Sequence, residues 1–257
     1  MASKKTNVDA CLFTKINKDE KTFVVIWVDD IIITTTSDEE MNRTKNSLKE
    51  KFKMKDLGQV SWFLGMEFEV TNDGIYLSQQ RYIRNILERF GMADSNPRET
   101  PCEIKIDEYE KKIINSKEDI KTYRKIVGSL IYAMTCSRPD LSYVVTKLSQ
   151  SLENPSEGDW MTIKQVLRYL KGTQNQKLFY GKTQNNLEIS GYCDSDWASS
   201  KDRRSTTGYC FSLNEGSGSI SWKSKKQETI ALSSCEAYGR HTRSYVFVNV
   251  NKRFWNT

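Results

Sequence analysis

The sequence predicts an α+β protein in which strands come first, helices occupy the middle and strands return near the end. Three observations support this prediction. The β-branched, apolar run FVVIWVDDIIITTT spans residues 23–36, and apolar residues recur at helical spacing between 123 and 170. Short strand-like segments with turn-rich spacers follow Gly172.

The first predicted elements are the strand run at 23–36, a helix over 38–53 and a β-hairpin. Ser37-Asp38-Glu39-Glu40 has the form of a capping box, and the apolar positions after it keep helical spacing. VSWFLGMEFEV then alternates without a break from Val60 to Val70, which predicts one strand. Asn72-Asp73-Gly74 and the strand IYLS complete the hairpin.

Helices are predicted in the middle of the chain. The first carries an apolar stripe from Tyr82 to Phe90 and ends at Gly91, and a polar surface connection follows from Met92 to about Lys117. Three more stripes start at Tyr123, Leu141 and Trp160, with prolines at their junctions. The last predicted strands are KLFYG, LEISGYC, TGYCFSL and SISWKS.

Composition restricts the chemistry to carboxylates. Lys and Arg number 39 against 33 Asp and Glu, and this net charge of +6 permits a polyanionic partner without requiring one. Six scattered cysteines without a CxxC pair predict neither a disulfide framework nor a zinc ribbon, and they fit a reducing compartment. The single histidine, His241, argues against a His-based zinc site and Ser-His-Asp catalysis.

The start MASKKTNVDA lacks the apolar core of a signal peptide, and no apolar run approaches ~18 residues. We therefore expect a soluble intracellular protein with no membrane partner. The sequence does not choose between cytoplasm and nucleus, because its basic residues form no dense nuclear-localisation cluster.

Asp29 and Asp30 interrupt an apolar run that predicts a buried strand, and a buried carboxylate needs a positive partner. Mg²⁺ would be such a partner, since it prefers oxygen ligands. Neighbouring residues on a strand point to opposite faces, so both could approach one ion only at the bend of a hairpin. One aspartate is then the ligand and the other shapes the turn. The alternative is a tight turn without catalysis.

A second group of carboxylates lies in GYCDSDWASSKDRRSTTGYCFSL and ISWKSKKQETIALSSCEA. Asp194 and Asp196 end one predicted strand, while Glu236 lies in a predicted helix after Ser233-Ser234. Carboxylates from a strand end and a helix can hold two metal ions ~4 Å apart for phosphodiester hydrolysis. Taken alone, each residue is more typical of a solvated cap or turn.

Two basic groups are candidates for nucleic-acid binding. One has helical spacing and consists of Lys164, Arg168 and Lys171; the other borders Trp222 and consists of Lys223, Lys225 and Lys226. Solvated polar faces are the alternative for both groups. If these residues bind, phosphate contacts dominate and the affinity falls steeply with salt.

From residue 10 to about 237, the chain resembles the C-terminal half of a copia-type long-terminal-repeat retrotransposon Pol protein. The motifs occur in order: DACLFTK, WVDDIIIT, MKDLGQVSWFLGMEFE, YIRNILERFGM, YRKIVGSLIYAMTCSRPDLSYVV, LRYLKGT, CDSDWA, RRSTTGYCF, ISWKSKKQ and ALSSCEA. This resemblance implies a partial reverse-transcriptase palm at 1–77, a helical thumb and connection at 78–172, and a truncated RNase H-like α/β domain with a divergent tail at 173–257.

The resemblance also assigns roles. Asp29 and Asp30 match the catalytic Asp pair of the palm, with Asp29 the metal ligand and Trp27 where Tyr is common. Asp194 and Glu236 match catalytic, metal-binding carboxylates of RNase H; the family signature also retains Asp196, whose role is less certain. Mg²⁺ or Mn²⁺ is the implied cofactor, and an RNA/DNA hybrid or duplex is the implied partner.

In the family, a further palm aspartate lies upstream and a third RNase H aspartate lies downstream, and this sequence has no Asp after Asp202. The chain is therefore expected to be a retrotransposon-derived fragment of an RNA-directed DNA polymerase with partial RNase H, catalytically incomplete alone. The alternatives are an enzyme completed by Pol segments in another chain, and a non-catalytic nucleic-acid-binding module. The tail from Tyr238 departs from the family pattern.

Overall fold

The computed structural model describes residues 4–5, 9–17, 20–103, 113, 116–182, 188–198, 202–214 and 216–237. The chain divides into two compact units, Met1–Phe63 and Leu64–Thr257. Antiparallel sheets and helices follow one another along the chain, which confirms the α+β prediction. The tail from Tyr238 lies outside the described residues.

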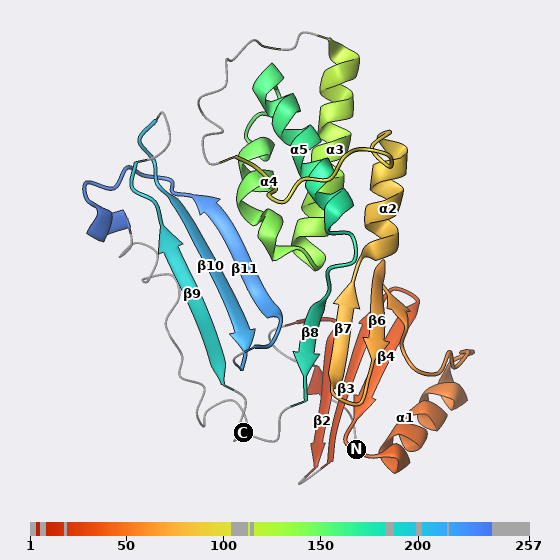
Figure 1. Ribbon diagram of the computed structural model, residues 1–257. Coiled ribbons are helices and arrows are strands. Elements are labelled where there is room, and N and C mark those ends of the chain that lie inside the picture. The colour runs from red at the N-terminus through yellow and green to blue at the C-terminus, as the bar shows by residue number, and fades with distance from the viewer. Residues whose placement is uncertain are drawn as a thin grey trace. The chain divides into compact units, whose positions relative to one another are not determined.

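The first unit contains an antiparallel sheet in chain order: β1 (Lys4–Lys5), β2 (Leu12–Asn17), β3 (Glu20–Trp27) and β4 (Asp30–Thr35) (Figure 1). Helix α1 (Asp38–Lys51) follows, close to its predicted range, and β5 (Trp62–Phe63) ends the unit. The Ser37 side chain caps α1 by accepting a hydrogen bond from the Glu40 backbone N–H at 3.3 Å.

The predicted capping box is only half formed, because the Glu40 carboxylate has stronger partners. Lys15 Nζ on β2 lies 2.5 Å from Glu40 Oε1, and Arg43 donates to Oε2 at 2.8 Å. The Glu40 side chain is buried, so a charged partner is required. The ion pair therefore ties α1 to the sheet of the first unit. The Lys15 hydrogen bond, followed by the Lys15 and Arg43 charges, holds the pKa of Glu40 below its ordinary value near 4.5.

This lowered pKa predicts acid sensitivity of the first unit. Glu40 contributes stability that is fully present above its unfolded pKa and is lost as pH falls from about 4.5 through the lower folded pKa. Glu40→Gln should flatten the pH dependence of unfolding in that window and lower stability at pH 7. Amide hydrogen exchange of residues 20–51 across a urea series measures this. Glu39→Gln, at an exposed neighbour, is the matched control; equal slopes in both variants would contradict the assignment.

The second unit begins with a turn that the sequence pattern did not predict. The prediction of one strand from Val60 to Val70 is wrong, because Leu64 and Gly65 take left-handed φ values of 50° and 74°. The Tyr132 hydroxyl donates to the Leu64 carbonyl and lies where a Cβ on residue 65 would be only 2.5 Å away. Packing of Tyr132 therefore selects glycine at position 65 and interrupts the alternation.

Beyond this turn, β6 (Met66–Val70), β7 (Gly74–Ser78) and β8 (Leu178–Gly181) pair antiparallel with β7 in the centre (Figure 1). The β6–β7 hairpin was predicted and is confirmed. The position of β8 was not predicted: this strand, about a hundred residues later in the chain, closes the sheet with the hairpin. Gly74 lies opposite Gly181 at the end of the β7–β8 pairing.

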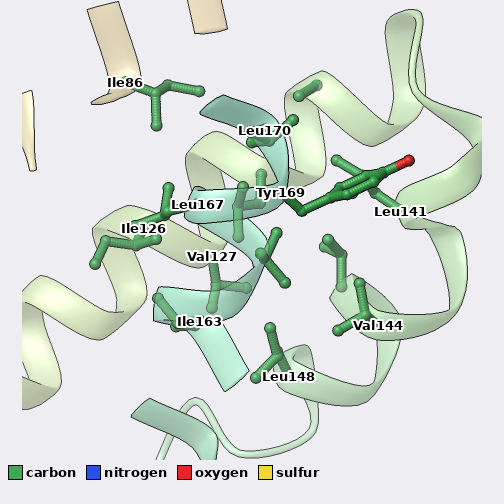
Figure 2. Close-up of a cluster of buried hydrophobic side chains, with 14 of the residues drawn as sticks. Ile86, Ile126, Val127, Leu141, Val144, Leu148, Ile163, Leu167, Tyr169 and Leu170 are labelled. Carbon is green, nitrogen blue, oxygen red and sulfur yellow. The ribbon is translucent and has the colours of Figure 1, made fainter. Parts of the chain in front are cut away.

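The four predicted helices are confirmed as α2 (Gln80–Arg89), α3 (Lys117–Cys136), α4 (Ser142–Ser149) and α5 (Glu157–Gly172), with a short 3₁₀ turn, η2 (Pro139–Leu141), before α4. Their apolar stripes meet in one core (Figure 2). Burying one such aliphatic side chain stabilises the fold by about 1.5–3 kcal/mol. Core members include Ile86, Tyr123, Val127, Leu130, Leu148, Ile163 and Leu167.

The last strands form a second antiparallel sheet in the order β11 (Ser219–Lys226), β10 (Thr206–Leu213) and β9 (Ile189–Ser195). Side-chain hydrogen bonds join β11 to the helices. Trp222 Nε1 donates to the Met134 carbonyl of α3 at 2.8 Å, and Thr146 Oγ1 of α4 donates to the Ser224 carbonyl at 3.2 Å. The helical segment and the final sheet therefore pack together within the second unit.

Candidate functional site

The predicted palm carboxylates lie at the tip of the β3–β4 hairpin. Trp27 pairs with Asp30, so Val28 and Asp29 form the two-residue turn between the strands. This is the bend that would allow neighbouring aspartates to approach one ion. The structure thus brings Asp29 and Asp30 together within one turn, while their catalytic roles stay predictions.

The hairpin tip is exposed, which corrects the expectation of a buried pair. Burial along β3 occurs at Thr22 and Val24 and ends before the tip, where Trp27 is 51% exposed and Val28 84% exposed. Water therefore solvates both aspartates, and the folded chain does not need a cation to neutralise them. Val28 has a φ of 52°, which is unfavourable for a β-branched residue; such strain is often found at functional sites.

Asp194 and Asp196 lie at the end of β9, as predicted. Asp194 is exposed and its Oδ1 accepts the Ser195 backbone N–H at 2.8 Å. Asp196 Oδ1 accepts the Thr206 backbone N–H at 2.6 Å, where β10 begins. Asp196 therefore joins two strand ends, a structural role that the sequence pattern did not reveal.

Glu236 lies in the helical turn 234–237, at the position predicted for a helix. Its backbone N–H donates to Ser233 Oγ at 3.1 Å, and its carboxylate accepts the Leu232 backbone N–H at 2.7 Å. These reciprocal bonds resemble a capping box displaced by one residue. The Glu236 carboxylate therefore stabilises the start of this helical turn.

One interaction brings the Glu236 segment to the end of β9. Trp197 Nε1 donates to the Ala231 carbonyl at 3.2 Å, which links the residues just after Asp196 to the loop just before the helical turn. A further link runs from the Ala198 backbone N–H to Ser205 Oγ at 3.2 Å, and Ser205 is fully buried. We call residues 194–198, 205–207 and 227–237 the strand-end corner.

The carboxylates of the strand-end corner have the oxygen ligands that Mg²⁺ prefers. This ion takes one or two carboxylates and completes its shell with water and substrate phosphate. Asp194 and Glu236 would be the ligands. Within the described parts of the chain, no three His, Cys, Asp or Glu side chains are grouped to hold a metal ion.

The three basic residues of α5 have different environments. Lys164 is exposed, but Arg168 Nε donates to the Asn96 carbonyl at 2.6 Å and the Arg98 backbone N–H donates to the Arg168 carbonyl at 3.3 Å. Arg168 therefore anchors the polar connection after α2, and Lys171 in the last turn is half-buried. Their role in nucleic-acid binding stays a prediction.

The lysines of β11 divide between two faces of the strand. Lys223 and Lys225 lie on the exposed side, whereas Lys226 lies on the side of Trp222 and forms an ion pair with Asp202 at 2.9 Å. Lys225 approaches Glu228 at 2.8 Å on the surface, a pair that contributes little stability.

The sequence pattern missed a buried polar network around Arg138. This side chain is only 2% exposed; it forms an ion pair with Asp140 at 2.7 Å and donates to Thr173 Oγ1 at 2.7 Å. Its guanidinium also lies 5.3 Å from the Tyr169 ring centroid, and the Tyr169 hydroxyl donates to Asp140 at 2.8 Å. An Arg-Pro-Asp sequence between two apolar stripes was the only signal, and it does not by itself indicate burial.

Comparison with known proteins identifies the class to which this protein belongs. A family model described as "Reverse transcriptase (RNA-dependent DNA polymerase)" matches residues 1–104, which include the Asp29–Asp30 hairpin. An uncharacterized mitochondrial protein of Arabidopsis thaliana is 39% identical over 216 residues, covering 83% of this chain and 87% of that protein.

Two Pol polyproteins are also similar. That of transposon TNT 1-94 from Nicotiana tabacum is 37% identical over 91% of this chain, and that of transposon RE1 from Arabidopsis thaliana is 38% identical over 89%. The chain belongs to the reverse-transcriptase family of copia-type retrotransposon Pol polyproteins. It spans 18% and 15% of the lengths of these two polyproteins. None of the helices in the described ranges is long and apolar enough to cross a membrane.

Proposed function

We propose that the chain is a segment of an RNA-directed DNA polymerase followed by the start of an RNase H, and that it is catalytically incomplete alone. The observation that carries the proposal is the exposed Asp29–Asp30 pair at a hairpin tip, within the residues matched by the reverse-transcriptase family. A polymerase needs carboxylates that hold metal ions against the substrate phosphates, and an exposed turn is accessible to both.

Asp29 would hold the divalent ion, and Asp30 would fix the direction of the turn. When bound, Mg²⁺ or Mn²⁺ supplies charge neutralisation at the phosphates of the reacting strand. The pairing of Trp27 with Asp30 holds the turn at the end of a regular hairpin. The left-handed φ of 52° at Val28 orients the peptide that leads into Asp29.

Asp194 and Glu236 would serve the RNase H activity, on the strand-end corner. Support for this role comes from the link between Trp197 and Ala231, which brings the end of β9 to the Glu236 segment. Asp194 accepts the Ser195 N–H and Glu236 accepts the Leu232 N–H, so each carboxylate also orders its own backbone. The incompleteness that we propose rests on the family resemblance, in which further aspartates complete both metal sites.

RNA/DNA hybrid is the proposed partner, held mainly through phosphate, and the cell interior is the proposed location. A second candidate function, hybrid binding without catalysis, is favoured by one observation: Lys223 and Lys225 share the exposed side of β11. Phosphate contacts from such lysines would make the affinity fall with salt.

The test is an assay of the purified chain for primer extension and for cleavage of the RNA strand of a hybrid, with Mg²⁺ or Mn²⁺. We expect both activities at background, with no further change in Asp29→Asn or Asp194→Asn. Adding a Pol segment that supplies the other palm carboxylates should restore extension to the parent chain and not to Asp29→Asn.

Turnover by the chain alone that either substitution abolishes would overturn the proposed incompleteness. Salt-sensitive hybrid binding that survives both substitutions, without complementation by added Pol segments, would favour the second candidate. Lys223→Gln with Lys225→Gln should then weaken binding and reduce its salt dependence.

A further inference from the structure

We infer that Gln227 is a positioning residue for Glu236: its carboxamide fixes the helical turn that carries this carboxylate against the strands of the final sheet. This inference rests on the proposed RNase H role of Glu236. Gln227 follows β11 directly and precedes the turn at 234–237 by a short loop.

Three hydrogen bonds place Gln227 in the middle of the strand-end corner. Its backbone N–H donates to the Ser205 carbonyl at 2.8 Å. Its side-chain Nε2 donates to Thr207 Oγ1 of β10 at 2.9 Å and to the Ala237 carbonyl at 2.9 Å. One amide group therefore bridges a strand and the residue next to Glu236.

The orientation of the Gln227 carboxamide is set by the hydrogen bonds of its Nε2 group, and not by those of its oxygen. Gln227 Oε1 is buried and has no hydrogen-bond partner among the described residues. Reversing the amide would place an oxygen against the Ala237 carbonyl and lose that bond, since a carbonyl needs a donor. The two hydrogen bonds donated by Nε2 therefore fix the Gln227 side chain, and one of them holds the Ala237 carbonyl in place.

The pairing of β10 with β9 connects Thr207 to the strand that bears Asp194. Thr207 lies opposite Ser195 in the β9–β10 register, and Gly208 lies opposite Asp194. Thr207, whose side chain accepts the hydrogen bond from Gln227, is therefore the sequence neighbour of Gly208, which pairs with Asp194. Because Ala237 and Ala231 are buried, the Glu236 turn is held at both ends while its carboxylate side remains partly accessible. Partners of this kind keep ligating groups oriented, and losing one typically weakens metal binding by about 10–100-fold.

The test compares the full-length chain with Gln227→Met, which keeps the side-chain length and removes the donors. Two quantities are measured: amide hydrogen exchange of residues 231–237 without metal, and Mn²⁺ affinity by water-proton relaxation. We expect faster exchange in this segment alone and Mn²⁺ binding weaker by roughly tenfold. Gln150→Met, the same substitution at an exposed position just after α4, should change neither quantity. Thr207→Val removes only the strand-side partner and should give a smaller effect.

A double-mutant cycle separates positioning from general stabilisation. In a Glu236→Gln background, Gln227→Met should still speed exchange but should weaken Mn²⁺ binding no further. Unchanged exchange and unchanged Mn²⁺ affinity in Gln227→Met, with Glu236→Gln still weakening Mn²⁺ binding, would overturn the positioning role. If Glu236→Gln leaves Mn²⁺ affinity unchanged, the proposed RNase H role of Glu236 fails instead, whatever the exchange shows.

Discussion

Replacing Arg138 with alanine is expected to destabilise the second unit by about 3 kcal/mol, the low end of the range for breaking a buried ion pair from one side, because Asp140 is 30% exposed. Arg138 is 2% exposed, and its guanidinium donates to Asp140 and to both oxygens of Thr173. The substitution removes the charged partner of Asp140, which keeps the Tyr169 hydroxyl as a donor, and opens a cavity beside Tyr169. Unfolding in urea, followed by far-UV circular dichroism, measures the loss.

The geometry of the guanidinium, rather than its charge alone, should account for most of this effect. Arg138 uses Nε and Nη2 together on Asp140 and still reaches Thr173, an arrangement that a lysine ammonium lacks. Arg138→Lys should therefore recover only a minor part of the lost stability. Tyr169→Phe, which removes one hydrogen bond to Asp140, should cost about 1 kcal/mol. Parent-like unfolding of Arg138→Ala would refute the structural importance of this network.

Sequence periodicity predicted the elements of this fold because periodicity is a local property. The apolar stripes that start at Tyr123, Leu141 and Trp160 each lie on a helix, and that face of each helix is buried in a common core. Alternation failed at Leu64 and Gly65, where the side chain of Tyr132 determines the backbone. That contact joins residues 68 positions apart, so no short window of sequence contains it.

The candidate site was predictable in its position and not in its environment. Two adjacent aspartates in a β-branched run indicated a hairpin bend, and the structure places Asp29 in that bend. The run also suggested burial, but the exposure of Trp27 and Val28 depends on how far the strands extend beyond the core. Likewise, Asp196 and Glu236 were recognisable as carboxylates near strand and helix ends. Their bonds to Thr206 and Leu232 depend on loop conformations that side-chain spacing does not specify.

Gly74→Ala is expected to destabilise the second unit by about 3 kcal/mol, because the added methyl group meets backbone that cannot move independently. A Cβ at this position would lie 2.2 Å from the Tyr180 carbonyl oxygen and 2.8 Å from Gly181 Cα. Relief requires β7 and β8 to separate where Gly74 pairs with Gly181. Hydrogen exchange should therefore rise in residues 74–78 and 178–181 before it rises in the helical core.

Gly128→Ala adds the same methyl group in a different environment and serves as the matched control. Gly128 is exposed in the middle of α3, and no atom lies within 4 Å of its added Cβ. Alanine there should stabilise the helix by about 0.5–1 kcal/mol, since glycine loses more backbone freedom on folding. The two variants should thus shift the urea midpoint in opposite directions. A Gly74→Ala midpoint equal to or above that of the parent would show that β8 does not pair with β7 as described.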